Sequence, residues 1–248
     1  MCERVAPNIW LHDVRLDGCD ARGALIVGRE RVAVWDTLSH PGDMRPFLPM
    51  LENRQFVVVY SHADWDHVWG TAGLPVDAPL IIAQAACRTR FDADVPAMLR
   101  EKQAETPGKY DDVRLVPPNL TFQRELSLDL GGIALTLRHL PGHTSDSIVA
   151  FLPERGMLLA GDAVETPFPA ISPDCPLRPW IDELERWERD PRVQTVIPSH
   201  GDIGGKAILR QNIAYLRALL DGRAAALPAA LTEFYRETHQ ENLRICRK

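Results

Sequence analysis

The chain lacks any long hydrophobic run. Across its 248 residues, no apolar stretch approaches the roughly 20 residues that a membrane-spanning helix needs. The first residues, Met1 to Arg4, also lack the apolar core of a signal peptide. These two absences predict a cytoplasmic protein without a membrane partner.

Positive charge and paired cysteines are scarce as well. The chain has 28 Lys and Arg against 34 Asp and Glu, a formal net charge of −6, whereas nucleic-acid binders usually carry a basic patch. The charge therefore argues against nucleic acid as a partner and leaves a small-molecule substrate. Five cysteines, none in a Cys-x-x-Cys pair, fit reduced thiols better than a disulfide framework.

The segment His62 to His67 concentrates metal-binding side chains. It reads His-Ala-Asp-Trp-Asp-His and directly follows the apolar run Phe56 to Tyr60, which predicts a strand. Imidazole nitrogens and carboxylate oxygens at such close spacing suit zinc, iron or manganese. The segment is therefore a candidate metal-binding loop at the end of a strand.

Three more candidates occur further along the chain in similar settings. They are His143 in Pro-Gly-His-Thr, Asp162 in Gly-Asp, and His200 in Ser-His-Gly. Taken singly, each could be an ordinary hydrogen-bonded or turn residue. Because each follows an apolar, strand-like run, the recurrence favours a shared metal site over separate structural roles.

This order resembles the metallo-β-lactamase superfamily, whose hallmark is a His-x-His-x-Asp-His loop followed by a lone His, a bridging Asp and a final His. The resemblance extends from Val5 to about Leu220. It implies an α/β fold in which two mixed β-sheets form a four-layer αββα sandwich with helices on both outer faces. One position departs from the pattern, because Asp64 stands where the family usually has its second histidine.

The resemblance also implies seven ligands for two divalent ions, most commonly zinc. One ion would take His62, Asp64 and His143, the other Asp66, His67 and His200, with Asp162 bridging both. A metal-bound hydroxide would attack a small ester-like substrate: an ester, thioester, lactone, lactam or phosphodiester. Asp66 would orient that hydroxide as the catalytic residue.

Asp64 leaves alternatives open. A carboxylate in place of an imidazole adds one negative charge to the ligand shell, which weakens the Lewis acid and lets manganese or iron compete with zinc. The flavodiiron proteins have a glutamate at this position and bind iron, so a di-iron redox protein is an alternative function. A metal-binding protein without catalysis is another. An Asp64 that only supports a ligand, or that is simply solvated, would leave only the site of Asp66, His67, Asp162 and His200 well occupied.

Residues around the metal loop have two interpretations each. Asp36 could orient a metal-binding histidine or simply cap a strand. Trp65 and Trp69 could form an apolar wall for substrate or belong to the core. His40 lies in a loop that could reach the site.

Apolar periodicity predicts the remaining organisation of one domain over residues 1–248. Strands are expected at Asn8–His12, Ala24–Val27, Val32–Trp35, Ile148–Leu152, Met157–Ala160 and Val193–Ile197, with a hairpin formed by Leu126–Leu130 and Ile133–Leu137. Helices are expected at Gly42–Leu51, around Trp180, Leu184 and Trp187, and in a C-terminal segment over 205–248 that carries the apolar stripe Ile208–Leu220. The stretch 87–119 is expected to be a lid-like insertion, and Ala163–Pro179, with five prolines, a rigid loop.

Overall fold

The computed structural model describes residues 2–75 and 80–246, which form two compact units. The first unit comprises Met1–Val14 and Ala21–Ala134, and the second comprises Arg15–Asp20 and Leu135–Lys248. Each unit carries part of the predicted ligand set. The single domain expected over residues 1–248 stays a prediction.

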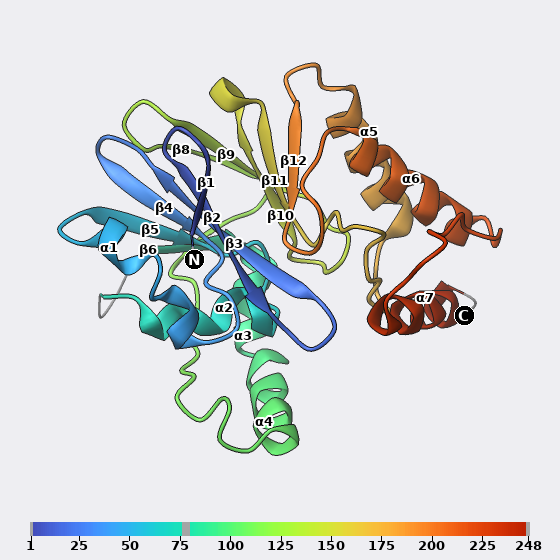
Figure 1. Ribbon diagram of the computed structural model, residues 1–248, viewed down its shortest axis with the longest axis horizontal. Coiled ribbons are helices and arrows are strands. Elements are labelled where there is room, and N and C mark those ends of the chain that lie inside the picture. Colours follow the sequence, from blue (N-terminus) through green and yellow to red (C-terminus); the bar gives the residue numbers. More distant parts are fainter. Residues whose placement is uncertain (1, 76–79, 247–248) are drawn as a thin grey trace. The chain divides into compact units, whose positions relative to one another are not determined.

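The first unit contains a mixed seven-stranded sheet in the order β1-β2-β3-β4-β5-β6-β7 (Figure 1). Its strands are β1 (Glu3–Ala6), β2 (Ile9–Arg15), β3 (Asp20–Val27), β4 (Arg31–Trp35), β5 (Gln55–Val59), β6 (Leu80–Gln84) and β7 (Leu120–Phe122). The β1–β2 and β3–β4 pairs are antiparallel, whereas β4 to β7 pair in parallel. The parallel arrangement brings the carboxyl ends of β5 and β6 to the same edge of the sheet.

The helices of this unit are short. They are η1 (Pro41–Met44), α1 (Leu48–Leu51), α2 (Trp65–Val68), η2 (Trp69–Gly73), α3 (Ala85–Phe91) and α4 (Val95–Glu105). The single helix expected over Gly42–Leu51 is wrong, because the structure has η1 and α1 instead. Pro46 lies between them and has no backbone N–H to donate to a continuous helix.

The stretch 87–119 contains most of α3, all of α4 and then irregular backbone that ends before β7. The irregular part packs onto the metal loop through Tyr110, whose ring centroid is 5.2 Å from that of Trp69 and 6.1 Å from that of Trp65. Trp69 and Tyr110 are both buried. Of the two interpretations of Trp69, membership of the core is therefore confirmed.

The second sheet is also mixed, with the strand order β12-β11-β10-β9-β8. Its strands are β8 (Glu125–Asp129), β9 (Ala134–His139), β10 (Ile148–Leu152), β11 (Met157–Gly161) and β12 (Thr195–Pro198). Strands β9, β10 and β11 pair antiparallel, and β12 pairs in parallel with β11. All of these strands were predicted, with β12 beginning two residues later than expected.

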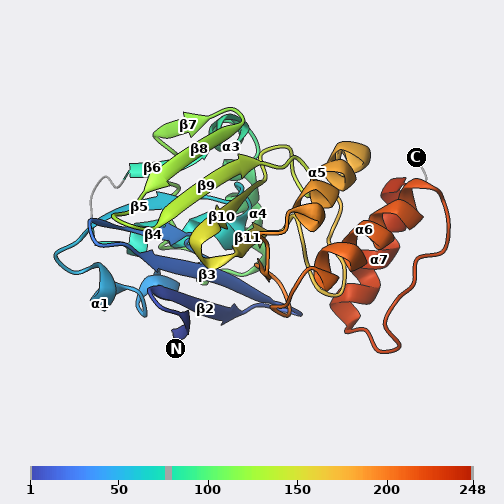
Figure 2. The same cartoon turned by 90° about the horizontal axis from the view of Figure 1, so that it is seen from above.

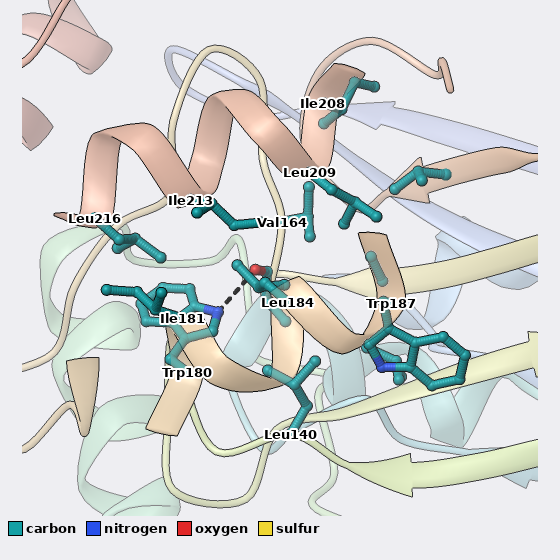
Figure 3. Packing of buried hydrophobic residues seen from close by; sticks show 14 of the residues in the cluster. Leu140, Val164, Trp180, Ile181, Leu184, Trp187, Ile208, Leu209, Ile213 and Leu216 are labelled. Carbon is teal, nitrogen blue, oxygen red and sulfur yellow. Dashed lines mark hydrogen bonds between the residues drawn. The ribbon is translucent and has the colours of Figure 1, made fainter. Parts of the chain in front are cut away.

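The described part of the second unit contains the helices η3 (Pro153–Arg155), α5 (Leu177–Arg189), α6 (Ala207–Leu220) and α7 (Glu233–Cys246). Helices α5 and α6 lie side by side in both views (Figure 1 and Figure 2). The predicted apolar face of Trp180, Leu184 and Trp187 is buried in the same core cluster as the stripe that begins at Ile208 on α6 (Figure 3). The predicted C-terminal helical segment thus consists of α6, a connecting stretch and α7.

The described residues confirm an α/β chain with two mixed sheets. None of their helices combines the length and apolar character needed to span a membrane. All five cysteines are free thiols, as the sequence predicted. The cytoplasmic location stays a prediction.

Candidate metal centre

The metal loop of the first unit, His62 to His67, follows β5 and runs into α2, which contains Asp66 and His67. It is fastened to the segment that follows β4: the backbone N–H of Thr37 donates to the carbonyl of His67 (2.7 Å), and that of Gly70 donates to the carbonyl of Leu38 (3.1 Å). The approach is so close that a Cβ on Gly70 would lie 1.7 Å from the carbonyl oxygen of Thr37. Glycine at position 70 therefore lets the loop sit against this segment.

Both histidines of the loop are held through Nδ1. His67 Nδ1 lies 2.9 Å from Oδ2 of Asp36, whose other oxygen accepts the backbone N–H of Ser61 at 2.7 Å. His62 Nδ1 lies 3.0 Å from the hydroxyl of Ser61, and the two imidazole centroids are 4.1 Å apart. The predicted contact between Asp36 and a candidate metal-binding histidine is confirmed.

The opposite ring nitrogens face the carboxylates of the same loop. His62 Nε2 is 3.5 Å from Oδ2 of Asp64, and His67 Nε2 is 3.7 Å from Oδ1 of Asp66. The first unit therefore brings together all four of its predicted ligands, with two nitrogens and two carboxylates gathered on one loop.

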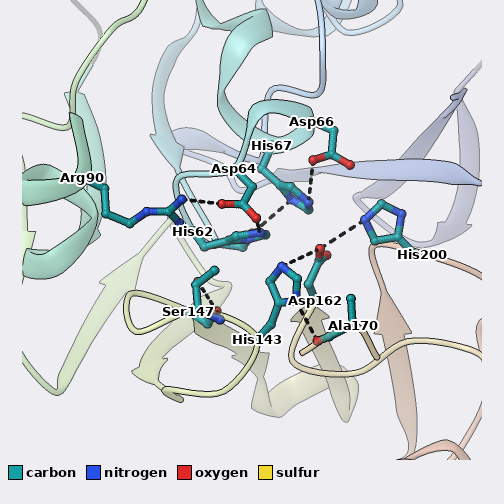
Figure 4. Close-up of polar contacts among 12 residues, drawn as sticks. His62, Asp64, Asp66, His67, Arg90, His143, Ser147, Asp162, Ala170 and His200 are labelled. Carbon is teal, nitrogen blue, oxygen red and sulfur yellow. Dashed lines mark hydrogen bonds and ion pairs between the residues drawn. The ribbon is translucent and has the colours of Figure 1, made fainter. Parts of the chain in front are cut away.

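The second unit brings together the other three predicted ligands. His143 Nε2 lies 3.7 Å and His200 Nε2 3.2 Å from Oδ2 of Asp162 (Figure 4). Their Nδ1 atoms are bound to the backbone carbonyls of Ala170 (3.0 Å) and Asp20 (2.7 Å). Because a carbonyl only accepts, each Nδ1 carries a proton, and Nε2 is the nitrogen that faces Asp162.

Trp180 contacts residues next to two of these ligands. Its Nε1 donates to the carbonyl of Ala163, the residue after Asp162, at 3.0 Å. Its ring also lies against Gly142, the residue before His143, where an added Cβ would come within 2.6 Å of the ring. One buried side chain on α5 thus contacts the two loops that carry His143 and Asp162.

The sequence did not single out Glu165, although it lies beside these ligands. One of its carboxylate oxygens lies within 4.8 Å of candidate ligand atoms of His143 and Asp162. Oε1 accepts the backbone N–H of Ala170 at 3.0 Å. Burial raises the pKa of Glu165 to about 7, with Asp162 adding to the rise and the imidazoles of His200 and His143 opposing it.

Arg90 was also missed. Its Nη2 lies 2.7 Å from Oδ1 of Asp64, and the two side chains are only 16% and 22% exposed. Asp64 is therefore an ion-paired and partly buried carboxylate, not a freely solvated one. No local pattern in the sequence relates the two residues, because the contact depends on the packing of α3.

The remaining candidates have other partners. His40 Nδ1 accepts the backbone N–H of Gly42, and its Nε2 pairs with Asp112 at 2.7 Å. Trp65 is half-buried, and the ammonium of Lys102 lies 5.3 Å from its ring centroid. His40 thus contacts the irregular part of the 87–119 stretch within the first unit.

The donor sets of both units fit a divalent metal. Metal-binding histidines usually donate their second N–H to a carboxylate or carbonyl, and three of the four imidazoles do so here through Nδ1. The accompanying donors are carboxylate oxygens, and nitrogen with oxygen is a set that zinc, manganese and iron accept. The residues present therefore match the metal chemistry that the sequence predicted.

Comparison with known proteins identifies the family. The model of the metallo-beta-lactamase superfamily matches residues 18–200, about three quarters of the chain. The chain belongs to this superfamily.

Solved structures show the same fold. A metallo-beta-lactamase from Pontibacter korlensis superimposes with a TM-score of 0.68 at 19% identity, covering 88% of this chain and 98% of that one. The FIM-1 enzyme of Pseudomonas aeruginosa, solved in a mono-zinc form, also gives a TM-score of 0.68, at 18% identity over 88% of this chain and 94% of that one. These similarities confirm the predicted αββα fold class.

A curated relative matches over a shorter stretch. The type 2 metallo-beta-lactamase of Bacteroides fragilis is 32% identical over 98 residues, which cover 37% of this chain. The match spans 39% of that relative's length.

Proposed function

We propose that the chain is a metal-dependent hydrolase that cleaves a small ester-like molecule: an ester, thioester, lactone, lactam or phosphodiester. The seven predicted residues would bind two divalent ions. One ion would take His62, Asp64 and His143, the other Asp66, His67 and His200, and Asp162 would bridge them.

The observation that carries this proposal is the orientation of the imidazoles. His67, His143 and His200 each donate through Nδ1 to a fixed oxygen, so that Nε2 faces a carboxylate. An imidazole held in this way is ready to bind a metal before the metal arrives. A core or surface histidine has no such requirement.

The metal ions and the protein residues would have different roles in the reaction. Bound ions would lower the pKa of water toward about 7, and so supply a nucleophile at neutral pH, and would polarise the oxygen under attack. Asp66 would accept a hydrogen bond from that nucleophile and direct it at the substrate. Asp36 would keep His67 in the tautomer that binds the metal.

Zinc is the metal we assign first, since the nitrogen-rich donor set suits it. The FIM-1 enzyme of the same superfamily was solved with one zinc ion. Asp64 supplies oxygen instead of nitrogen, so manganese and iron are included in the test.

Elemental analysis of protein purified without added metal tests the metal content. The same preparation is then assayed on p-nitrophenyl acetate, a thioester, a homoserine lactone, a cephalosporin and bis-p-nitrophenyl phosphate. About two zinc or manganese ions per chain with turnover on one of these substrates would support the proposal. Iron with a visible absorption band would favour the redox alternative, and bound metal without turnover would favour a binding protein.

Two variants with a matched control complete the test. Asp66→Asn keeps the shape of the side chain but loses its negative charge, so we expect kcat to fall by roughly 10²–10⁴-fold, the usual contribution of a positioned proton acceptor. His143→Ala should lose metal. His239→Ala serves as the control, because His239 lies on α7 and its Nδ1 pairs with the hydroxyl of Tyr215.

A further inference from the structure

Arg90 lies against the single ligand position that departs from the pattern of the superfamily. Its Nη2 is 2.7 Å from Oδ1 of Asp64, whereas Oδ2 of Asp64 is 3.5 Å from Nε2 of His62 (Figure 4). The two oxygens of one carboxylate thus face different groups. One oxygen meets a guanidinium and the other meets a candidate ligand atom.

Arg90 is held in place by its helix and by a second carboxylate. Helix α3 starts directly after β6, and β6 is the parallel neighbour of β5, the strand that precedes the metal loop. A second carboxylate holds the guanidinium: Oδ2 of Asp94 lies 3.1 Å from Nε and 2.7 Å from Nη2 of Arg90. The sheet and the start of α4 therefore fix the group that touches Asp64.

We propose that Arg90 is a positioning residue for Asp64: it holds Oδ1 and so presents Oδ2 as a single ligand atom on the side of His62. The proposal rests on the proposed function, in which Asp64 is a metal ligand. An imidazole at this position could not use Arg90 as its partner, because the nitrogen that faces away from the metal carries a proton and a guanidinium only donates hydrogen bonds. A carboxylate has two equivalent oxygens and can turn or bind through both.

The guanidinium also changes the charge of the shell. Replacing the usual imidazole by Asp64 adds one negative charge, and Arg90, which stays protonated at all physiological pH values, adds one positive charge beside it. Because Asp94 shares this positive charge, the weaker Lewis acid expected from Asp64 alone is offset in part. Together, Asp64 and Arg90 would supply the single oriented ligand atom that a histidine supplies at this position in the superfamily.

Metal affinity measured by competition with a chelator tests this role. Removing a partner that orients a ligand usually lowers metal affinity by roughly 10–100-fold. We therefore expect Arg90→Ala to lower the affinity for one of the two zinc ions by that factor. Arg90→Lys keeps the charge but loses the planar fork, and should restore part of the affinity. The visible spectrum of the cobalt(II) form should change in Arg90→Ala, because it responds to the number and kind of ligands.

Arg88→Ala is the matched control. Arg88 lies on the same helix and makes an ion pair of 2.6 Å with Asp92. We expect both zinc affinities and the cobalt spectrum of this variant to match the wild type. Asp64→His supplies the decisive background, because an imidazole at position 64 should make Arg90→Ala nearly silent.

Three results would overturn the proposal. If Asp64→Ala loses an ion but Arg90→Ala leaves affinity and spectrum unchanged, Arg90 has no positioning role while the proposed function stands. The role is equally refuted if Arg90→Ala costs as much in the Asp64→His background as in the wild type. If Asp64→Ala itself retains both ions, Asp64 is not a ligand, and the proposed ligand set fails together with the role of Arg90.

Discussion

At the scale of single residues, Asp36 shows how one buried carboxylate can direct a metal ligand. It is fully buried and binds both His67 Nδ1 and the backbone N–H of Ser61. Asp36→Asn should lower metal affinity by roughly 10–100-fold, since it weakens the group that orients His67. Asp36→Ala should in addition reduce the free energy of unfolding of the metal-free protein by about 2 kcal/mol, because buried donors lose their acceptor.

Asp43→Ala provides the comparison for Asp36. Asp43 accepts a hydrogen bond from Ser39 at 2.9 Å in the neighbouring loop but contacts no predicted ligand through that bond. Zinc affinity should be unchanged in this variant when it is measured by chelator competition. Equal zinc affinities in Asp36→Asn and Asp43→Ala would show that the contact with His67 has no influence on the metal.

Because of Glu165, we expect the stability of the metal-free protein to depend on pH. Burial raises its pKa in the folded state from the usual 4.5 to about 7, so between these pH values the folded chain binds more protons than the unfolded chain. The free energy of unfolding should therefore fall as pH rises from about 4.5 to 7, by a contribution of about 3 kcal/mol, and this contribution should stay constant above that range.

Urea unfolding at a series of pH values tests the contribution of Glu165. Glu165→Gln cannot ionise, so its stability should decline less between pH 4.5 and 7 than that of the wild type. Exposed Glu154 in the turn before β11 gives the control substitution Glu154→Gln, which should follow the wild-type curve. Parallel curves for the wild type and Glu165→Gln would mean that Glu165 titrates normally.

At the scale of elements, α5 supports the ligands of the second unit through Trp180. Trp180→Phe removes the hydrogen bond to Ala163 and part of the surface under Gly142, so both adjoining ligand loops lose support. We expect the free energy of unfolding to fall by about 1–2 kcal/mol for the lost bond and its unpaired carbonyl. Zinc affinity should fall with it, as measured by chelator competition.

Trp187→Phe is the control for Trp180→Phe, because it disturbs the packing of α5 without removing a contact to a ligand loop. Trp187 lies on the same face of α5 and is buried against Phe151 of β10, with ring centroids 5.4 Å apart. This variant should lose stability without losing zinc affinity. An equal loss of affinity in both variants would attribute the effect to packing of the helix rather than to Trp180.

Elements with a strong periodic pattern could be predicted from the sequence. Alternating leucines around Gly131 and Gly132 predicted the β8–β9 hairpin, and the apolar stripes predicted α5 and α6. Strand β6 was not predicted, because the run from Leu80 to Ala83 is short and uniformly apolar and so does not distinguish strand from helix.

The ligands themselves could be predicted, but their supporting residues mostly could not. Each ligand belongs to a local motif at a strand end, whereas Arg90 and Glu165 acquire their roles from contacts that no local pattern encodes. Asp36 is the exception, because a carboxylate at the end of a neighbouring strand already indicated a partner for a histidine. Long-range contacts of charged residues depend on tertiary packing, and periodicity carries no information about them.

At the scale of the whole molecule, the proposed function makes metal binding a property of both compact units. A ligand that binds only the folded state stabilises it, by about 2.7 kcal/mol when its free concentration is 100 times its Kd. Chelation should therefore lower the melting temperature. Hydrogen exchange should lose protection in residues 61–68, which include the metal loop, and around His143, Asp162 and His200 as well.

Asp64→Ala distinguishes one shared centre from separate sites in the two units. In the proposed assignment, Asp64 and His143 bind the same ion, so removing a carboxylate of the first unit should reduce the zinc-dependent protection of residues 141–144 in the second. Arg88→Ala, which alters only a surface ion pair on α3, should leave that protection intact. If Asp64→Ala affects exchange in residues 61–68 alone, His143 draws its metal from a different site, and the assignment of a common ion to Asp64 and His143 is wrong.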